Sequence, residues 1–268
     1  MSKGLLDPKV DFVFKNIFGS PNHPEILISF LNATLKPKKK IVNVDIKKTD
    51  IEKQYIEDKY SRLDVKATTS NDEIINIEIQ LKNENNMVKR SLYYLSKMYE
   101  EQLNEKEDYS KLARTVCINI LNFKYLKTDN FHTGYRFKEI ESNEELTDIM
   151  EVHFIEIPKL QDSSDEKDML VAWTEFLKDP ESEKVRGLEL SIEEIRQAKD
   201  ELIRMSNDKK QRELYDMRAN SLRDKISELN AAKREGIEEV ARNMKKNELP
   251  IEMISKLTGL RVDEIDKL

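Results

Sequence analysis

The sequence predicts an α/β protein with an all-helical C-terminal extension, and three observations support this fold class. Residues 61–68 and 74–81 alternate apolar and polar side chains, which is the pattern of β-strands. The residues between them, 69–73, are rich in turn formers and predict a hairpin. Between Leu188 and Glu235 apolar residues recur every three or four positions without any Pro or Gly, which predicts long helices.

The other elements follow from the same two periods. Helices are expected where apolar residues recur at helical spacing: residues 10–18, 24–35 and 87–103. Further strands are expected where apolar residues alternate or run together: residues 41–46, 115–123 and 151–157. A helix between the hairpin and the strongly apolar strand 115–123 makes the crossover that parallel neighbours require. The predicted sheet is therefore mixed, with this strand near its centre.

The first predicted helix carries ordinary helix signals and one candidate functional residue. We expect Asp7 to cap its N-terminus, with Pro8 in the first turn, and Gly19 to end it. Asp11, close to the N-terminus, suits the helix dipole and needs no further role on these grounds alone.

Two carboxylates of the hairpin are expected to face each other. Folding the chain back about residues 70–71 brings Asp64 nearly opposite Glu78, and strand alternation puts Gln80 on the same face. Mg²⁺ prefers oxygen ligands and keeps several waters, so one or two carboxylates suffice to hold it beside a phosphate. The pattern outlines a divalent metal site. On periodicity alone, however, an ordinary polar face exposed to solvent is the commoner meaning.

Five separate segments resemble the PD-(D/E)XK nucleases, and more closely the Rpn family of recombination-promoting nucleases, whose members are often labelled putative transposases. The segments are Asp7-Pro-Lys-Val-Asp-Phe-Val-Phe-Lys-Asn-Ile-Phe-Gly19, Arg62-Leu-Asp-Val65, Asn76-Ile-Glu-Ile-Gln80, Arg90-Ser-Leu-Tyr-Tyr94 and the stretch at 146–156. They resemble, in order, the family's opening segment, its two catalytic strands, the helix that follows them and a late strand. The resemblance covers roughly residues 5–160.

This resemblance implies a restriction-endonuclease-like PD-(D/E)XK core and the activity of a metal-dependent DNA endonuclease. It also implies a link to DNA recombination or to mobile-element and phage-related processes. Asp64 and Glu78 would be the ligands of Mg²⁺, with Mn²⁺ or Ca²⁺ as alternatives. Gln80 would position the attacking water, and Asp11 would assist from the first helix. DNA is the implied partner.

Gln80 stands where the commonest pattern of the superfamily has Lys. Gln offers hydrogen bonds without a positive charge, so the charge must come from the metal or from another cation. Lys66 and Lys82 match the parity of the site, and Lys15 qualifies if the first helix packs nearby. Arg90 is the fourth candidate DNA contact, because in the family-like arrangement it approaches the scissile phosphate. A plain surface position for Arg90 stays open.

Composition limits the class of protein further. The chain has 46 Lys and Arg against 52 Asp and Glu, and the net charge of −6 disfavours long-range attraction of DNA but allows a local basic groove. The three His residues and the single Cys117 leave zinc sites without ligands and exclude an internal disulfide. No apolar run approaches the roughly 18 residues that a membrane span requires, so we expect a cytoplasmic protein with no membrane partner.

The composition changes at the polar stretch 161–168, and it suggests three domains. Residues 1–160 are expected to form the nuclease-like domain, 161–235 a helical linker or extension, and 236–268 a small helical domain for oligomerisation or regulation. A homodimer through the C-terminal helices follows as a hypothesis. A second function also stays open, in which the nuclease fold is catalytically degenerate and serves as an interaction module assembled through this helical tail.

Overall fold

The computed structural model describes residues 4–47, 65–165 and 167–268. Contacts within the chain divide it into two compact units, Met1–Tyr215 and Asp216–Leu268. Each unit is described by itself below.

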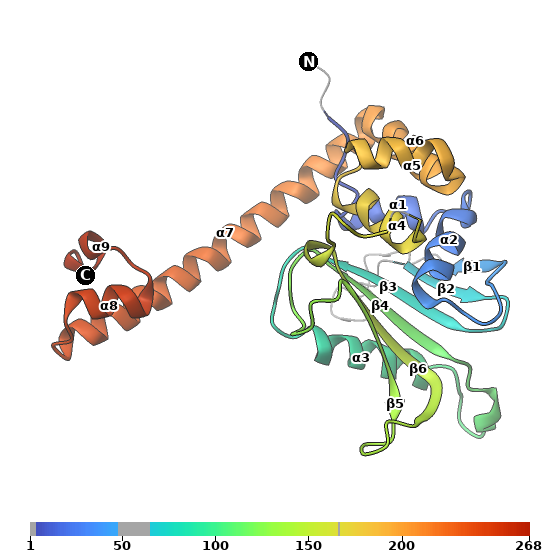
Figure 1. Ribbon diagram of the computed structural model, residues 1–268, viewed down its shortest axis with the longest axis horizontal. Coiled ribbons are helices and arrows are strands. Elements are labelled where there is room, and N and C mark those ends of the chain that lie inside the picture. Colours follow the sequence, from blue (N-terminus) through green and yellow to red (C-terminus); the bar gives the residue numbers. More distant parts are fainter. Residues whose placement is uncertain (1–3, 48–64, 166) are drawn as a thin grey trace. The chain divides into compact units, whose positions relative to one another are not determined.

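The first unit is built on one mixed sheet, whose described strands have the order β1-β2-β3-β4-β6-β5 (Figure 1). The strands are β1 Val44–Lys47, β2 Val65–Thr69, β3 Ile74–Gln80, β4 Thr115–Leu121, β5 His132–Lys138 and β6 Glu145–Glu156. The pairs β3·β4 and β4·β6 are parallel, and the other neighbours are antiparallel. Every residue of β4 is buried, as expected for a central strand. The predicted α/β fold class is confirmed.

The predicted hairpin forms between β2 and β3. Val65 pairs with Ile77 and Lys66 pairs with Asn76 in its antiparallel register. The turn is closed by the Thr69 amide, which donates to the Glu73 carbonyl at 2.9 Å.

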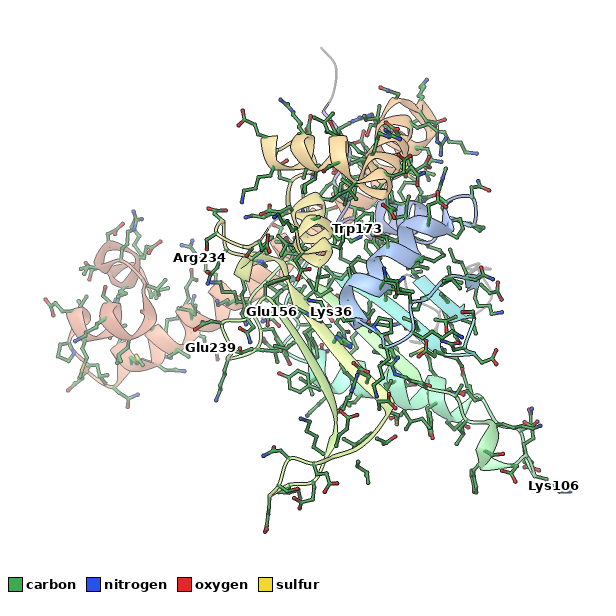
Figure 2. All side chains as sticks on the ribbon, turned by 45° about the vertical axis from the view of Figure 1, so that its right-hand side comes forward. Lys36, Lys106, Glu156, Trp173, Arg234 and Glu239 are labelled. Carbon is green, nitrogen blue, oxygen red and sulfur yellow. The ribbon has the colours of Figure 1, made fainter. Side chains whose placement is uncertain are left out.

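Most helices of this unit cover one face of the sheet, and Figure 1 shows α1, α2 and α4 on that side. The helices are α1 Asp11–Phe18, α2 Pro24–Leu35, α4 Met169–Lys178, α5 Glu183–Ser191 and α6 Glu193–Asn207. Trp173 lies where α4 meets the N-terminal helices (Figure 2), with its ring 5.3 Å from that of Phe18. Its indole nitrogen donates to the Ser29 hydroxyl at 3.2 Å. These helices share one apolar core with Ile77 of β3 and Ile118 of β4.

The other face of the sheet is covered by α3, Met87–Glu100. Its buried side chains Met87, Leu95 and Met98 pack with Cys117 of β4 and Phe154 of β6 in a second apolar cluster. The helix after the hairpin therefore crosses over to the parallel strand β4, as the sequence predicts.

The start of α1 differs from the prediction. The helix begins at Asp11, and Val10 rather than Asp7 occupies the cap position. Asp7 instead closes the preceding turn, because its carboxylate accepts from the Lys9 amide at 2.9 Å and its carbonyl accepts from the Val10 amide at 3.1 Å. Gly19 ends the helix as expected, since its amide bonds to the Lys15 carbonyl.

The C-terminal helices also differ in their boundaries. The segment predicted to form long helices is interrupted at Ile192 and at Asp208, although neither is Pro or Gly. The helix α7, Lys209–Lys246, then runs without a break through Gly236, where the third domain was expected to begin. Whether residues 1–160, 161–235 and 236–268 fold independently stays a prediction.

The second unit contains the C-terminal part of α7 together with α8, Ile251–Thr258, and α9, Val262–Asp266. Its small apolar core consists of four buried side chains: Ala241, Ile254, Leu260 and Ile265. Gly259 ends α8 in the left-handed conformation, with φ of 74°, which glycine adopts without strain.

Two further expectations from the composition concern the single cysteine and membrane-spanning segments. Cys117 is a free, buried thiol of β4, and burial raises the pKa of this group far above its ordinary value. Within the described ranges, none of the helices combines the length and the apolar character needed to cross a bilayer.

Candidate active site

Glu78 lies in the middle of β3, between β2 and the central strand β4. Strand alternation directs Ile77 and Ile79 into the core beneath α1 and α2, so Glu78 faces the side that α3 covers. The carboxylate is almost completely buried, with 1% of the residue exposed. Periodicity alone favours exposure to solvent for the polar face of the hairpin, but at Glu78 this face is buried.

The Glu78 carboxylate is paired through one oxygen and unpaired through the other. Its Oε1 accepts a hydrogen bond from Gln80 Nε2 at 3.0 Å and forms an ion pair with Arg90 Nη2. Its Oε2 is buried and accepts no hydrogen bond from any residue that the structure describes. Burial raises the pKa of Glu78 above its ordinary value, and the charge and hydrogen bond of Arg90 offset only part of this effect.

Arg90 reaches Glu78 from the first turn of α3. Its Nη1 also lies 3.8 Å from the Glu84 carboxylate, on the connection that leads into α3. The guanidinium carbon sits 5.5 Å from the centre of the buried Tyr94 ring, one turn further along the helix. Burial acts to lower the pKa of Arg90, but the charges of Glu78, Tyr94 and Glu84 and the hydrogen bond to Glu78 together outweigh burial and raise this pKa.

Further polar groups line the same face of the sheet beneath α3. Asn119 of β4 pairs with Glu78 across the parallel ladder and accepts a hydrogen bond from the Ser91 hydroxyl at 2.9 Å. Asn76 of β3 is also buried, and its Oδ1 has no hydrogen-bond partner within the described part of the chain. Sequence reasoning missed Asn119 and Ser91. A lone amide within the apolar run of β4 is the signal that could have found the first of them.

The structure brings together three of the residues singled out from the sequence: Glu78, Gln80 and Arg90. Lys66 lies on the same face, because it pairs with Asn76 in the hairpin register. Lys82 follows β3 and is half-buried.

Three other candidates belong to the helix on the other face of the sheet or lie outside the described residues. Asp11 and Lys15 belong to α1, which packs on the opposite face of the sheet. The Asp11 carboxylate accepts a hydrogen bond from the Phe12 amide at 2.7 Å. Asp64 lies outside the described residues.

The sequence from residue 8 to 232 matches the profile of the PD-(D/E)XK nuclease family transposases. The chain belongs to this family. No curated protein and no solved structure was found to match the chain. The resemblance drawn from the five sequence segments is thereby confirmed at the level of the PD-(D/E)XK nucleases of transposase type. The match also extends beyond the segments and includes α4, α5 and α6.

PD-(D/E)XK nucleases generally use divalent metal ions and act on DNA, so the site can be tested for its fit to such an ion. Within residues 4–47, 65–165 and 167–268, no three His, Cys, Asp or Glu side chains gather into a metal-holding group. Glu78 Oε2 nevertheless offers a buried, unpartnered carboxylate oxygen, which is the donor type that Mg²⁺ prefers. This PD-(D/E)XK site thus fits a hard divalent cation through at least one ligand.

A second buried polar network lies on the opposite face of the sheet in this PD-(D/E)XK core. His153 Nε2 and Glu151 Oε1 are 2.6 Å apart, and His153 Nδ1 is 2.9 Å from His132 Nε2. Glu151 also forms ion pairs with Arg114 and Arg136. The network joins β5, β6 and Arg114, the residue before β4, which fits a structural role for His153.

Proposed function

We propose that this chain is a metal-dependent DNA endonuclease that hydrolyses phosphodiester bonds. The observation that carries the proposal is the buried Glu78 carboxylate, which keeps one oxygen unpartnered in the described structure and has Gln80 beside it. A buried carboxylate with an open oxygen is costly to a protein that does not use it. Membership of a nuclease family supplies the reaction class.

Asp64 and Glu78 are the proposed metal ligands, with Mg²⁺ as the preferred ion and Mn²⁺ or Ca²⁺ as substitutes. The pair follows the sequence pattern, in which folding the hairpin back about residues 70–71 brings Asp64 nearly opposite Glu78. Such an ion makes a bound water more acidic and neutralises charge that develops on the phosphate.

The other proposed roles follow from the chemistry of each side chain. Gln80 orients the attacking water, since its amide both donates and accepts hydrogen bonds and already contacts Glu78. Asp11 is the proposed assisting residue from α1, a role that rests on the family resemblance. Lys15, Lys66 and Lys82, with Arg90, are the proposed contacts to DNA phosphates.

The deciding experiment incubates supercoiled plasmid with the purified protein and Mg²⁺ or Mn²⁺. Nicking or linearisation is expected with the wild type and should be lost in Asp64→Ala, in Glu78→Gln and with EDTA. Asp72→Asn is the matched control, because Asp72 is an exposed carboxylate of the hairpin turn with φ of 61°, a conformation that Asn tolerates. Absence of cleavage by the wild type, with equal DNA binding by wild type and Asp64→Ala, would favour the interaction-module function.

The cellular process and assembly form a second part of the proposal. We infer that the nuclease acts in the cytoplasm on DNA of recombination or mobile-element processes and works as a homodimer. The second unit supports self-association, because α7 and α8 border a groove of about 380 Å³ whose lining includes the exposed Val240 and Leu257.

Light scattering on the full chain tests the dimer. The wild type is expected at twice the chain mass, and the double variant Val240→Glu with Leu257→Glu at the mass of one chain. Leu190→Glu is the control, since Leu190 is a leucine of α5 that is even more exposed, at 87% against 60% for Leu257. A monomeric wild type at micromolar concentration would contradict the dimer and leave the nuclease proposal untouched.

A further inference from the structure

We propose that Arg90 is a displaceable counter-ion of Glu78, which leaves this carboxylate when a divalent cation arrives and moves toward Glu84 and a DNA phosphate. The inference rests on the proposed function, because it assigns to the same site a device that couples metal binding to DNA binding.

The first step concerns the charge of Glu78. A carboxylate with 2% of its side chain exposed requires a cation beside it. In the structure Arg90 supplies that cation to Oε1 alone, and Oε2 stays without a hydrogen bond from the described residues. A guanidinium that satisfied this carboxylate fully would bind both oxygens in a fork. The contact with one oxygen indicates that Arg90 satisfies the Glu78 carboxylate only in part.

The second step concerns the alternatives open to Arg90. Its Nη1 lies 3.8 Å from Glu84 Oε2, and the Glu84 side chain is 34% exposed, so a second carboxylate stands on the solvent side of the guanidinium. Its Nε is buried without a hydrogen-bond partner in the described part of the chain. A short rotation of the side chain therefore exchanges one carboxylate for the other.

The third step concerns what keeps the movement local. The backbone of α3 is held by the buried Met87 and Leu95, and the Tyr94 ring lies beside the guanidinium. An aromatic ring attracts a cation over a broad area of its face, so it supports the guanidinium in both positions. Only the Arg90 side chain has to move.

The fourth step is electrostatic. A divalent ion bound to Glu78 would lie within a few ångströms of the Arg90 guanidinium. Both groups are positively charged, and their repulsion is weakly screened in a buried site. Arg90 would therefore leave Glu78 when such an ion is bound there. The released guanidinium, turned toward solvent, has the geometry to bind a phosphate through two parallel hydrogen bonds.

Metal binding without cleavage is the direct test, measured by titration calorimetry with Mn²⁺ in the absence of DNA and at mildly alkaline pH. Arg90→Met is expected to bind Mn²⁺ about tenfold more tightly than the wild type, because the competing cation is gone. Glu84→Gln is expected to bind it about threefold more weakly, since Arg90 then lacks its second carboxylate. Glu78→Gln should lose this binding altogether.

DNA binding in Ca²⁺ gives a second readout. In the wild type, Ca²⁺ should increase the affinity for a short duplex, and this increase should be lost in Arg90→Met and restored in Arg90→Lys. Replacing a residue that merely supported the fold would not strengthen metal binding and at the same time abolish the gain in DNA affinity caused by Ca²⁺.

The outcomes separate the two proposals. If wild type binds no Mn²⁺ through Glu78, the proposed function fails. If wild type binds Mn²⁺ but folded Arg90→Met binds it equally or more weakly, only the counter-ion role fails. Should Arg90→Met not fold, Glu84→Gln decides, because Glu84 lies on an exposed connection and its substitution leaves the core unchanged. Unchanged Mn²⁺ affinity in Glu84→Gln then overturns the exchange.

Discussion

At the residue scale, Glu78 combines a proposed chemical function with a thermodynamic cost. Its pKa is raised by burial, and a carboxyl whose pKa is higher in the folded than in the unfolded protein binds protons more tightly when folded. It therefore loses stabilising effect as pH rises from the unfolded value of 4.5 through the raised value, and at neutral pH the buried charge opposes folding.

A bound divalent ion should relieve this cost. We expect Mn²⁺ at about one hundred times its dissociation constant to raise the free energy of unfolding of the wild type by about 2.7 kcal/mol. Glu78→Gln should show no such increase, while Asp72→Asn should behave as the wild type. Thermal unfolding followed by circular dichroism measures the effect. Equal stabilisation of Glu78→Gln would place the ion elsewhere on the protein.

A second residue-scale prediction concerns Gly134 of β5. A Cβ added there would lie 3.0 Å from Cε1 and 3.2 Å from Nδ1 of the buried His153 ring. We expect Gly134→Ala to lower the free energy of unfolding by about 1–3 kcal/mol, because the ring is fixed on its other side by Glu151.

Gly187→Ala is the matched control for this substitution. Gly187 lies within α5, and an added Cβ would meet nothing within 4 Å, so the change should stabilise the helix by up to about 1 kcal/mol. Denaturant unfolding of both variants gives the comparison. A Gly134→Ala variant as stable as the wild type would mean that the two histidine rings can move apart at little cost.

At the scale of elements, the histidine network predicts how the β4–β6–β5 part of the sheet responds to acid. Burial lowers the pKa of His132 to about 4, and the neighbouring His153 adds to the effect. Lys36 and Asp168 also act on His132, with opposite signs. Because the folded pKa lies below the ordinary 6.5, the neutral ring favours folding above pH 6.5, and this stabilisation is lost as pH falls from 6.5 toward 4.

The free energy of unfolding is expected to fall by up to about 3 kcal/mol between pH 6.5 and 4, and His132→Gln should flatten this dependence on pH.

Glu151 responds in a different pH range. Burial acts to raise its pKa, but His153 and Arg114 outweigh burial and lower it to about 2, so its contribution is lost only between pH 4.5 and 2. Urea unfolding at a series of pH values resolves the two ranges. An unchanged slope between pH 6.5 and 4 in His132→Gln would assign the acid response to other groups.

The elements also show what periodicity can and cannot predict. The β2–β3 hairpin and the central strand β4 follow directly from their patterns, because alternation and an unbroken apolar run each report burial. β5, with the sequence His-Thr-Gly-Tyr-Arg-Phe-Lys, was missed. It is an edge strand whose residues are mostly exposed, so burial imposes no pattern on it.

The same reasoning explains why only part of the candidate site could be predicted. Glu78 and Gln80 lie two residues apart on one strand, and strand geometry alone puts them together. The contact of Arg90 with Glu78 depends on where α3 packs on the sheet, which is a tertiary property that local sequence does not contain. Family resemblance placed Arg90 near the phosphate, but the ion pair itself came only from the structure.

At the scale of the whole molecule, the boundary of the first unit makes a prediction about fragments. The helices after residue 160 complete the core of the first unit: Trp173 and Leu202 are fully buried, and the Leu6 amide donates to the Ser206 hydroxyl at 3.0 Å. The contacts continue to Tyr215, whose hydroxyl accepts from the Asp7 amide at 3.4 Å. A nuclease-like domain that ended at 160 would expose this core.

We therefore expect a fragment of residues 1–215 to unfold cooperatively and to bind Mn²⁺ through Glu78, as proposed for the full chain. A fragment of residues 1–160 should lack a cooperative transition, because Phe18 and its neighbours on α1 and α2 lose the cover of Trp173 and α6. The longer fragment should also be monomeric if residues 216–268 carry the dimer contact. Circular dichroism melts, calorimetry and light scattering measure the three properties. Cooperative unfolding of the 1–160 fragment would support the division expected from composition, and a dimeric 1–215 fragment would move the self-association surface to the first unit.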